Sequence, residues 1–299
     1  MLIIAKFLII LYIVRTLYIG TIMDRIELGS RTAKGGFANE KDICVKFNNW
    51  KVDKEAQTWF KILGYDIEKI DFVKAIQIPV RIKKSELDKY TVNIEVYDEL
   101  IRFKKADIQI KITIIIGNIL KIENLSLKKA NSDANYNQID KRSVNTYQEM
   151  WRFDDDIAFW LKLFTGENNI NSYPGLKTNR ELRNMKRIFF DEMPDNKIKK
   201  IVRFFKKNKI LVVSDLLKGR GGLSANWILV TKLNKSDNTT TWILKDINYA
   251  MNFFGGGEIK ISPKGSLSIG RITMQRKGGT PDPTKLQFKI KPCDLFLEG

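Results

Sequence analysis

An aspartate and a lysine in the middle of the chain are spaced so that a β-hairpin would bring them together. Residues 107–128 alternate isoleucine or leucine with polar residues on both sides of Gly117-Asn118, a dipeptide typical of hairpin turns. If the turn contains only these two residues, Asp107 lies directly opposite Lys128. Ser126 then lies on the same face, because alternate residues of a strand point to the same side.

An acid, a hydroxyl and an ammonium at the open end of a hairpin suit the metal-assisted hydrolysis of a phosphodiester. Oxygen ligands bind Mg²⁺, which polarises a phosphate and activates water, and a lysine can orient that water. The same spacing also suits a plain ion pair between two strands, which contributes less than about 1 kcal/mol. The spacing alone leaves both interpretations open.

The inventory of side chains excludes several other chemistries. The chain has 299 residues, no histidine, and only two cysteines, which lie far apart at Cys44 and Cys293. Triads with an imidazole base, histidine-ligated zinc and paired-cysteine sites are therefore excluded. The formal charge of +18, from 52 Lys+Arg against 34 Asp+Glu, indicates a polyanionic partner such as DNA, RNA or an acidic membrane surface.

The first 22 residues are apolar but poorly suited to a membrane span. Lys6 and Arg15 interrupt them, and a spanning helix needs about 20 consecutive apolar residues. Met23 begins an ordinary soluble amino terminus, so we expect residues 1–22 to be upstream sequence with a mis-assigned start. We accordingly expect a cytoplasmic bacterial protein without stable membrane association. A membrane-inserted helix is the alternative.

The hydrophobic spacing predicts an α/β protein around the hairpin. The chain reads as an α/β portion, 23–207, followed by a more β-rich and basic portion, 208–299, in which short strands alternate with glycine-rich turns. Helices are predicted within 30–63, with a break near 50–53, within 140–165, and over the strongly basic segment 178–207, while strands are predicted at 74–82, 90–99, 107–116 and 119–128.

Six stretches, in order along the chain, carry a resemblance to a known family. They are residues 28–34, 39–43, 135–141, 147–151, 275–279 and 286–289. Together they resemble the HinP-type restriction endonucleases, relatives of MspI in the PD-(D/E)xK nuclease superfamily. The resemblance implies a PD-(D/E)xK nuclease-like mixed sheet flanked by helices, with a catalytic domain over 23–207 and a β-rich C-terminal DNA-recognition portion over 208–299.

The resemblance also implies roles for the hairpin residues. The family places an aspartate, an amide side chain and a lysine at the spacing of Asp107, Ser126 and Lys128. It implies that Asp107 and the main-chain carbonyl of Leu127 hold Mg²⁺, with Ser126 at the third metal position, and that Lys128 assists the attacking water. Ser126 departs from the family pattern, since its hydroxyl is shorter than Gln or Asn, and activity could be reduced or lost. Glu40 resembles the accessory acid of the superfamily, or is a plain acid in the first turn of a helix.

Contacts with base edges are expected from a loop after the hairpin and from basic turns, because base edges carry the sequence information. An aromatic ring can wedge between base pairs, glutamine offers a donor and an acceptor, and Arg or Lys suits guanine. The candidates are Tyr136, Asn137, Gln138 and Lys141 in the expected loop, Arg220 between glycines, and Gln275, Arg276 and Lys277 before Gly278-Gly279. An ordinary basic turn is the alternative for the glycine-flanked residues.

The resemblance finally implies a type II restriction endonuclease. Such an enzyme hydrolyses double-stranded DNA with Mg²⁺ at a short palindrome of G and C, with GCGC favoured, and leaves 5′-phosphate ends. A cognate DNA methyltransferase belongs to the same system but not as a bound subunit, and we expect a monomer or a weak homodimer. The alternative is a catalytically weakened relative that binds a specific DNA sequence.

Overall fold

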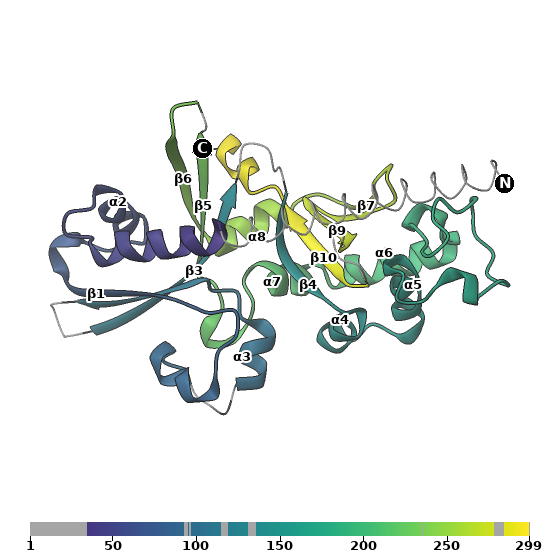
Figure 1. Ribbon diagram of the computed structural model, residues 1–299, viewed down its shortest axis with the longest axis horizontal. Coiled ribbons are helices and arrows are strands. Elements are labelled where there is room, and N and C mark those ends of the chain that lie inside the picture. Colours follow the sequence, from purple (N-terminus) through teal and green to yellow (C-terminus); the bar gives the residue numbers. More distant parts are fainter. Residues whose placement is uncertain are drawn as a thin grey trace, which may run out of the picture.

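Two sheets with helices packed against them organise the chain (Figure 1). The structure, a computed structural model, describes residues 35–92, 95, 97–114, 119–130, 136–234, 236–277 and 284–298. The expectations about residues 1–22 and about the turns at Gly117-Asn118 and Gly278-Gly279 lie outside these ranges. Within them, a search for apolar helices of membrane-spanning length finds none.

The first sheet is mixed and has five strands in the order β1-β2-β3-β5-β6. All neighbouring strands are antiparallel except β3 and β5, which are parallel. The strands are β1 (Ile70–Gln77), β2 (Ile108–Ile114), β3 (Ile119–Ala130), β5 (Trp227–Asn234) and β6 (Thr239–Asp246). This mixed sheet confirms the predicted α/β class.

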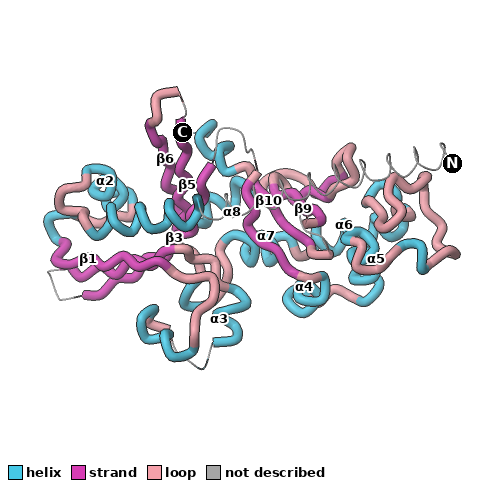
Figure 2. The backbone as a smooth tube through the Cα atoms, in the orientation of Figure 1, coloured by secondary structure: helices cyan, strands magenta, loops and turns pink. Residues whose placement is uncertain are grey.

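The second sheet is antiparallel and has five strands in the order β4-β10-β9-β8-β7. The tube view separates its strands from those of the first sheet (Figure 2). The strands are β4 (Asn137–Arg142), β7 (Ile259–Ile261), β8 (Leu267–Ile269), β9 (Ile272–Arg276) and β10 (Leu286–Ile290). The predicted portions 23–207 and 208–299 remain a prediction, but each sheet takes strands from both of them.

The predicted helices near the amino terminus cover one face of the first sheet. A helix runs through residues 35–48 and α2 (Lys54–Ile62) follows the predicted break. Asp53 caps α2 by accepting a hydrogen bond from the Ala56 N–H at 2.9 Å. Aromatic residues of these helices pack against the isoleucines at 108, 110 and 112, which are fully buried. The alternating pattern of β2 therefore buries one face, as predicted.

Helices α3 to α8 surround the remaining faces. Figure 1 shows α2 and α3 on opposite sides of the first sheet. The other helices share the largest hydrophobic core with the second sheet, and α8 also contacts β5 and β6 of the first sheet. The bounds are α3 (Tyr97–Phe103), α4 (Val144–Trp151), α5 (Asp155–Thr165), α6 (Asp195–Lys207), α7 (Lys209–Leu217) and α8 (Ile247–Gly255), with a 3-10 helix at Lys84–Tyr90.

The predicted register of the hairpin is wrong by two residues. Ile114 pairs with Ile119, so residues 115–118 separate the paired ends where we predicted a two-residue turn. Gln109 consequently lies opposite Asn124 instead of Ser126. A shift by an even number of residues keeps every side chain on its predicted face, because strand side chains alternate with a period of two. The error therefore left the predicted grouping of polar residues intact.

Several predicted elements were wrong because tertiary packing outweighed local pattern. Residues 90–99, predicted as a strand, contain the end of a 3-10 helix and the start of α3. Residues 140–142, predicted as helix, belong to β4, and most of 178–194 is not helical, since α6 begins only after Pro194. Helices α7 and α8 were missed in the portion predicted to be β-rich. Both are mainly apolar, and α7 lacks the clear amphipathic stripe that marks a surface helix.

Candidate active site

Four atoms from Asp107 and strand β3 meet at one point. The Lys128 Nζ lies 2.9 Å from the Ser126 Oγ, 2.8 Å from the Leu127 carbonyl oxygen and 3.4 Å from the Asp107 Oδ2. The Asp107 Oδ2 also accepts hydrogen bonds from the Leu127 N–H at 2.6 Å and from the Ser126 hydroxyl at 3.3 Å. The structure thus brings together the side chains that we predicted to meet. We call Asp107, Ser126, Leu127 and Lys128 the β3 cluster.

The alternation of β3 explains why the cluster is open to a pocket. Leu125 and Leu127 point into the core beneath the amino-terminal helices, so Ser126 and Lys128 point to the other side. Asp107 lies just before β2, where its N–H donates to the Leu125 carbonyl oxygen at 2.8 Å. Asp107, just before the start of β2, and Ser126 and Lys128 on β3 therefore present their polar groups to the same space.

Glu40 reaches the same region from the helix through residues 35–48. Gln77 on β1 donates a hydrogen bond to the Glu40 Oε2 at 2.5 Å. Burial raises the pKa of the Glu40 carboxyl, and the charge of Asp107 adds to the rise although the Gln77 hydrogen bond opposes it. Because residues 35–39 are already helical, Glu40 is not in the first turn. The alternative of an acid in the first turn is therefore wrong, and the accessory-acid role of Glu40 remains a prediction.

Lys104 is a site residue that sequence reasoning missed. Its Nζ donates to the Pro79 carbonyl oxygen at 2.7 Å. Burial lowers the pKa of Lys104, while the carboxylates of Asp107 and Glu40 oppose this effect. Two lysines in a row at 104 and 105, shortly before Asp107, are an available signal, but such a pair usually marks a solvated surface.

The β3 cluster forms one wall of a pocket of about 390 Å³, and β4 contributes another wall. Asp107, Ser126 and Lys128 line the pocket together with Gln138 and Lys141. Two of the predicted DNA-contacting residues are thus next to the predicted catalytic residues. They belong to a strand and not to the expected loop, because β4 pairs with β10.

The other two residues of the predicted loop make different contacts. The Tyr136 side chain is 44% exposed, and the Lys291 ammonium lies over its ring, 5.2 Å from the centroid. Asn137 donates its Nδ2 hydrogen to the Lys129 carbonyl oxygen at 2.8 Å. Tyr136 is therefore accessible to a partner, whereas part of the Asn137 amide already serves to join β3 to β4.

The candidates near residue 276 lie on β9 and its end, across the second sheet from β4. In that sheet Gln287 of β10 pairs with both Lys141 of β4 and Gln275 of β9, so the three side chains share one face. Burial lowers the pKa of Lys277, and the charge of Lys141 lowers it further. The proximity of these cations makes this face of the sheet electropositive beside the pocket.

Two arginine candidates are more enclosed. Burial lowers the pKa of Arg276, which is half-buried. Arg220 donates from Nε and Nη2 to the two oxygens of Asp215, both at 2.7 Å, and its guanidinium lies 4.1 Å from the centroid of the Phe103 ring. Arg220 therefore has a structural role, and its predicted contact with DNA remains a prediction.

The β3 cluster has the donor chemistry of a site for a hard cation. Among the described residues there is no group of three or more Asp, Glu, His or Cys side chains that could hold a metal ion. The oxygens of Asp107, Ser126 and Leu127 nevertheless surround a single cation, the Lys128 ammonium. One carboxylate, one hydroxyl and one carbonyl fit Mg²⁺, which takes oxygen ligands and keeps several of its waters.

The chain is similar to a known family and to solved structures. The R.HinP1I restriction endonuclease family matches residues 89–296. Among solved structures, the restriction endonuclease MspI in complex with its cognate DNA matches with a TM-score of 0.53 at 13% sequence identity, over 85% of this chain and 88% of that chain. No curated protein matches the chain. At this identity the structural match establishes the fold, and the family match covers both β3 and β4.

Proposed function

Because the chain belongs to the R.HinP1I restriction endonuclease family, we propose that this type II site-specific deoxyribonuclease cuts double-stranded DNA at a short palindrome of G and C, with GCGC the favoured site. The proposed reaction depends on Mg²⁺ and leaves 5′-phosphate ends. It takes place in the bacterial cytoplasm, where a separate DNA methyltransferase protects the host DNA. The enzyme acts as a monomer or a weak homodimer.

The observation that carries this proposal is the convergence of three oxygens on the Lys128 Nζ. The Asp107 carboxylate, the Ser126 hydroxyl and the Leu127 carbonyl are the groups that would hold Mg²⁺. The divalent ion, when bound, supplies Lewis-acid polarisation of the phosphate and neutralises its developing charge. This donor set supports a hard cation over zinc, which prefers nitrogen and sulfur ligands.

Two side chains would act on the attacking water and the scissile phosphate. The Lys128 ammonium orients the water by hydrogen bonding and stabilises the negative charge that grows on the phosphate. Glu40 adds a second carboxylate, whose raised pKa reflects burial and its nearness to Asp107. The two carboxylates and the lysine come from three different elements, so their closeness depends on the tertiary fold. This closeness supports a shared role in hydrolysis.

The pocket supports recognition of bases close to the cut. Gln138 and Lys141 share the pocket with the β3 cluster. A glutamine amide can pair with a base edge through one donor and one acceptor, and lysine suits the N7 and O6 of guanine. Exposed Tyr136 would stack on or wedge between bases, and Gln275 and Lys277 extend the face that carries Lys141. Arg276 points to the opposite face of β9 and is a separate candidate. A lysine-rich and arginine-rich surface supports a target that contains guanine.

A catalytically weakened DNA-binding relative is the second candidate. Ser126 favours it, because the family has an amide side chain at this position and the serine hydroxyl reaches less far. With Ser126, Asp107 supplies the only carboxylate within the β3 cluster. This candidate keeps the DNA surface and loses efficient hydrolysis.

The deciding experiment is digestion of a fully sequenced plasmid with the purified protein and Mg²⁺, followed by mapping of the ends. We expect discrete fragments with 5′-phosphate ends. Asp107→Ala and Lys128→Ala should abolish cutting while each variant still binds the mapped site in Ca²⁺, because their charges act on hydrolysis more than on affinity. The matched control is Lys121→Ala, an exposed lysine on the same strand β3, which should cut normally.

The outcomes separate the two candidates. Site-specific binding without cutting by the wild-type protein at any Mg²⁺ concentration supports the weakened relative. Normal cutting by both Asp107→Ala and Lys128→Ala would show that the β3 cluster is not the active site.

A further inference from the structure

We propose that Lys105 and Asp140 are positioning residues that couple the predicted base-reading strand β4 to the segment that carries Asp107. The inference rests on the proposed function. Lys105 precedes Asp107 by two residues, and Asp140 lies between Gln138 and Lys141. Both members of the pair line the pocket that holds the β3 cluster.

The two side chains form a buried ion pair. Their side chains are only 8% and 4% exposed. The Lys105 Nζ donates a hydrogen bond to the Asp140 Oδ2, and it donates a second one to the Ile139 carbonyl oxygen at 3.2 Å. One lysine therefore binds both a side chain and the main chain of β4.

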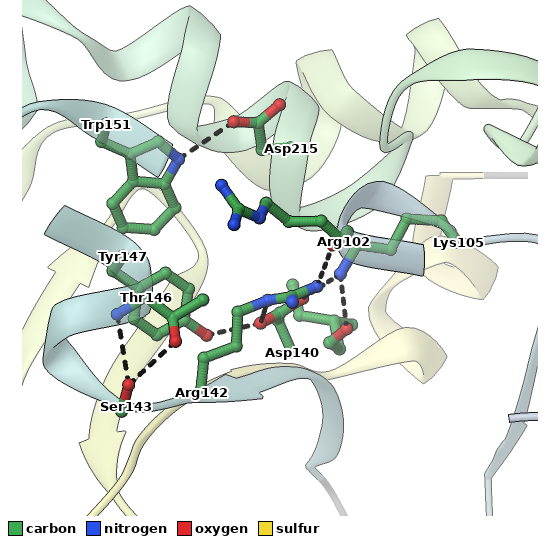
Figure 3. Close-up of polar contacts among 10 residues, drawn as sticks. Arg102, Lys105, Asp140, Arg142, Ser143, Thr146, Tyr147, Trp151 and Asp215 are labelled. Carbon is green, nitrogen blue, oxygen red and sulfur yellow. Dashed lines mark hydrogen bonds and ion pairs between the residues drawn. The ribbon is translucent and has the colours of Figure 1, made fainter. Parts of the chain in front are cut away.

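The Asp140 carboxylate also has partners from β4 and α4, which Figure 3 shows converging on it. The Tyr147 hydroxyl donates to the Asp140 Oδ1 at 2.5 Å, and the Arg142 Nε donates to the same oxygen at 2.9 Å. The Arg142 Nη2 donates in turn to the Arg102 carbonyl oxygen of α3 at 2.5 Å. Both carboxylate oxygens are thus fixed, and so is the position of β4 beside the end of α3.

Each member of the pair favours the charged form of the other. Burial lowers the pKa of Lys105, and the Asp140 carboxylate opposes this effect. Burial alone would raise the pKa of Asp140, but the cations of Lys105 and Arg142 outweigh burial and hold this pKa below its usual value. A buried charge that loses its partner is strongly unfavourable, so the two groups constrain each other's position. The contact is therefore stiff rather than a loose surface pair.

This link matters because β2 and β4 belong to different sheets. Among the described residues no strand ladder joins them, so side-chain contacts contribute to their relative position. Asn137 provides one link, to β3, and the Lys105–Asp140 pair provides another, close to Asp107. A contact of Gln138 or Lys141 with the correct bases would set the position of β4, and the ion pair would transmit that position to the Asp107 carboxylate.

The test compares cleavage with binding in Asp140→Asn and in the double variant Lys105→Met/Asp140→Asn, which removes both charges together. We expect single-turnover cleavage at saturating enzyme to slow about 10- to 100-fold, while affinity for the same DNA in Ca²⁺ changes less than about threefold. We also expect a smaller ratio between cleavage at the preferred site and at sites changed by one base pair. Lys105→Arg, which keeps a cation, should retain most of the rate.

The control variant is Tyr65→Phe, which removes a hydrogen bond of 2.6 Å to Glu123 away from the pocket. It should lower thermal stability without changing the cleavage ratio. If Asp140→Asn does not fold, Tyr147→Phe removes one hydrogen bond from Asp140 and should change rate and ratio in the same direction. The inference is overturned if the folded Asp140 variants cleave at the wild-type rate and with the wild-type ratio between preferred and altered sites. It is also overturned if their losses equal those of Tyr65→Phe. A wild-type protein that cuts no DNA overturns the proposed function itself.

Discussion

The Lys128 ammonium contacts each of the oxygens that are proposed to hold a metal ion. In the protein alone it neutralises the Asp107 carboxylate at 3.4 Å and satisfies the Leu127 carbonyl at 2.8 Å. A buried acceptor without a partner is costly, so this arrangement keeps the oxygens together before a metal ion arrives. The lysine thus has a structural function in addition to its proposed role beside the water.

Ser126 is the residue of the β3 cluster whose replacement is most informative. Its hydroxyl is too short to match the family's amide, while the adjoining pocket of about 390 Å³ has space for a longer side chain. We predict that Ser126→Gln lowers the Mg²⁺ concentration needed for half-maximal cleavage and raises the rate, because the amide oxygen reaches the ion directly. A titration of cleavage rate against Mg²⁺ measures this.

The control for this prediction is Ser126→Ala, which removes the hydroxyl and should raise the Mg²⁺ requirement. If alanine, serine and glutamine give the same Mg²⁺ dependence, residue 126 does not contribute to the metal site.

At the scale of elements, β4 is the strand that we propose joins recognition to catalysis. It pairs with β10 in the second sheet, and it lines the pocket opposite the β3 cluster. A strand holds side chains more rigidly than a loop does, which favours accurate contact with base edges. Lys289 of β10 pairs with Gln138, so the base-facing side of β4 continues onto its neighbour.

We predict that Gln138→Ala relaxes specificity more than it weakens affinity. Loss of a paired donor and acceptor at a base edge should reduce discrimination at that base by about 1–3 kcal/mol. Cleavage rates on a set of sites that differ by one base pair provide the measurement. The matched control is Gln57→Ala. Gln57 is a glutamine of α2 that does not line the pocket, so this variant should discriminate between sites as the wild type does. Equal discrimination by the two variants would remove Gln138 from base recognition.

At the scale of the whole molecule, some cationic side chains form ion pairs with carboxylates, while others lie close to further cations. Many surface lysines and arginines form ion pairs, such as Lys200 with Asp154 at 2.8 Å, whereas Lys141, Lys277 and Lys289 influence one another as like charges beside the pocket. Burial lowers the pKa of Lys289, and the charge of Lys277 lowers it further. Such a cluster is relieved when a phosphate backbone approaches.

We predict a salt dependence of DNA binding that reports this cluster. The logarithm of the affinity in Ca²⁺ should fall linearly with the logarithm of the salt concentration, and each phosphate contact should add about 0.9 to the slope. Lys277→Ala should reduce the slope by about 1. Lys54→Ala, at an exposed lysine of α2, should leave it unchanged, and a reduction of equal size in both variants would contradict a local DNA surface beside β9.

The sequence alone determined which residues share a face and which family the chain resembles. The alternation of isoleucines in β2 and β3 placed Asp107, Ser126 and Lys128 on one side, and an error of two in register did not change this, because the period of a strand is two. The amino-terminal helices were also predictable, since their aromatic residues follow a helical period and Asp53 is a typical cap.

Only the tertiary structure decided which distant segments meet. The pairing of β3 with β5, the pairing of β4 with β10, and the ion pair between Lys105 and Asp140 join residues that are separated by dozens of positions. Local pattern carries no information about such contacts, because they form only when the whole core packs. The position of β4 beside Asp107 therefore depends on the long-range packing of two sheets and not on the residues of β4 alone.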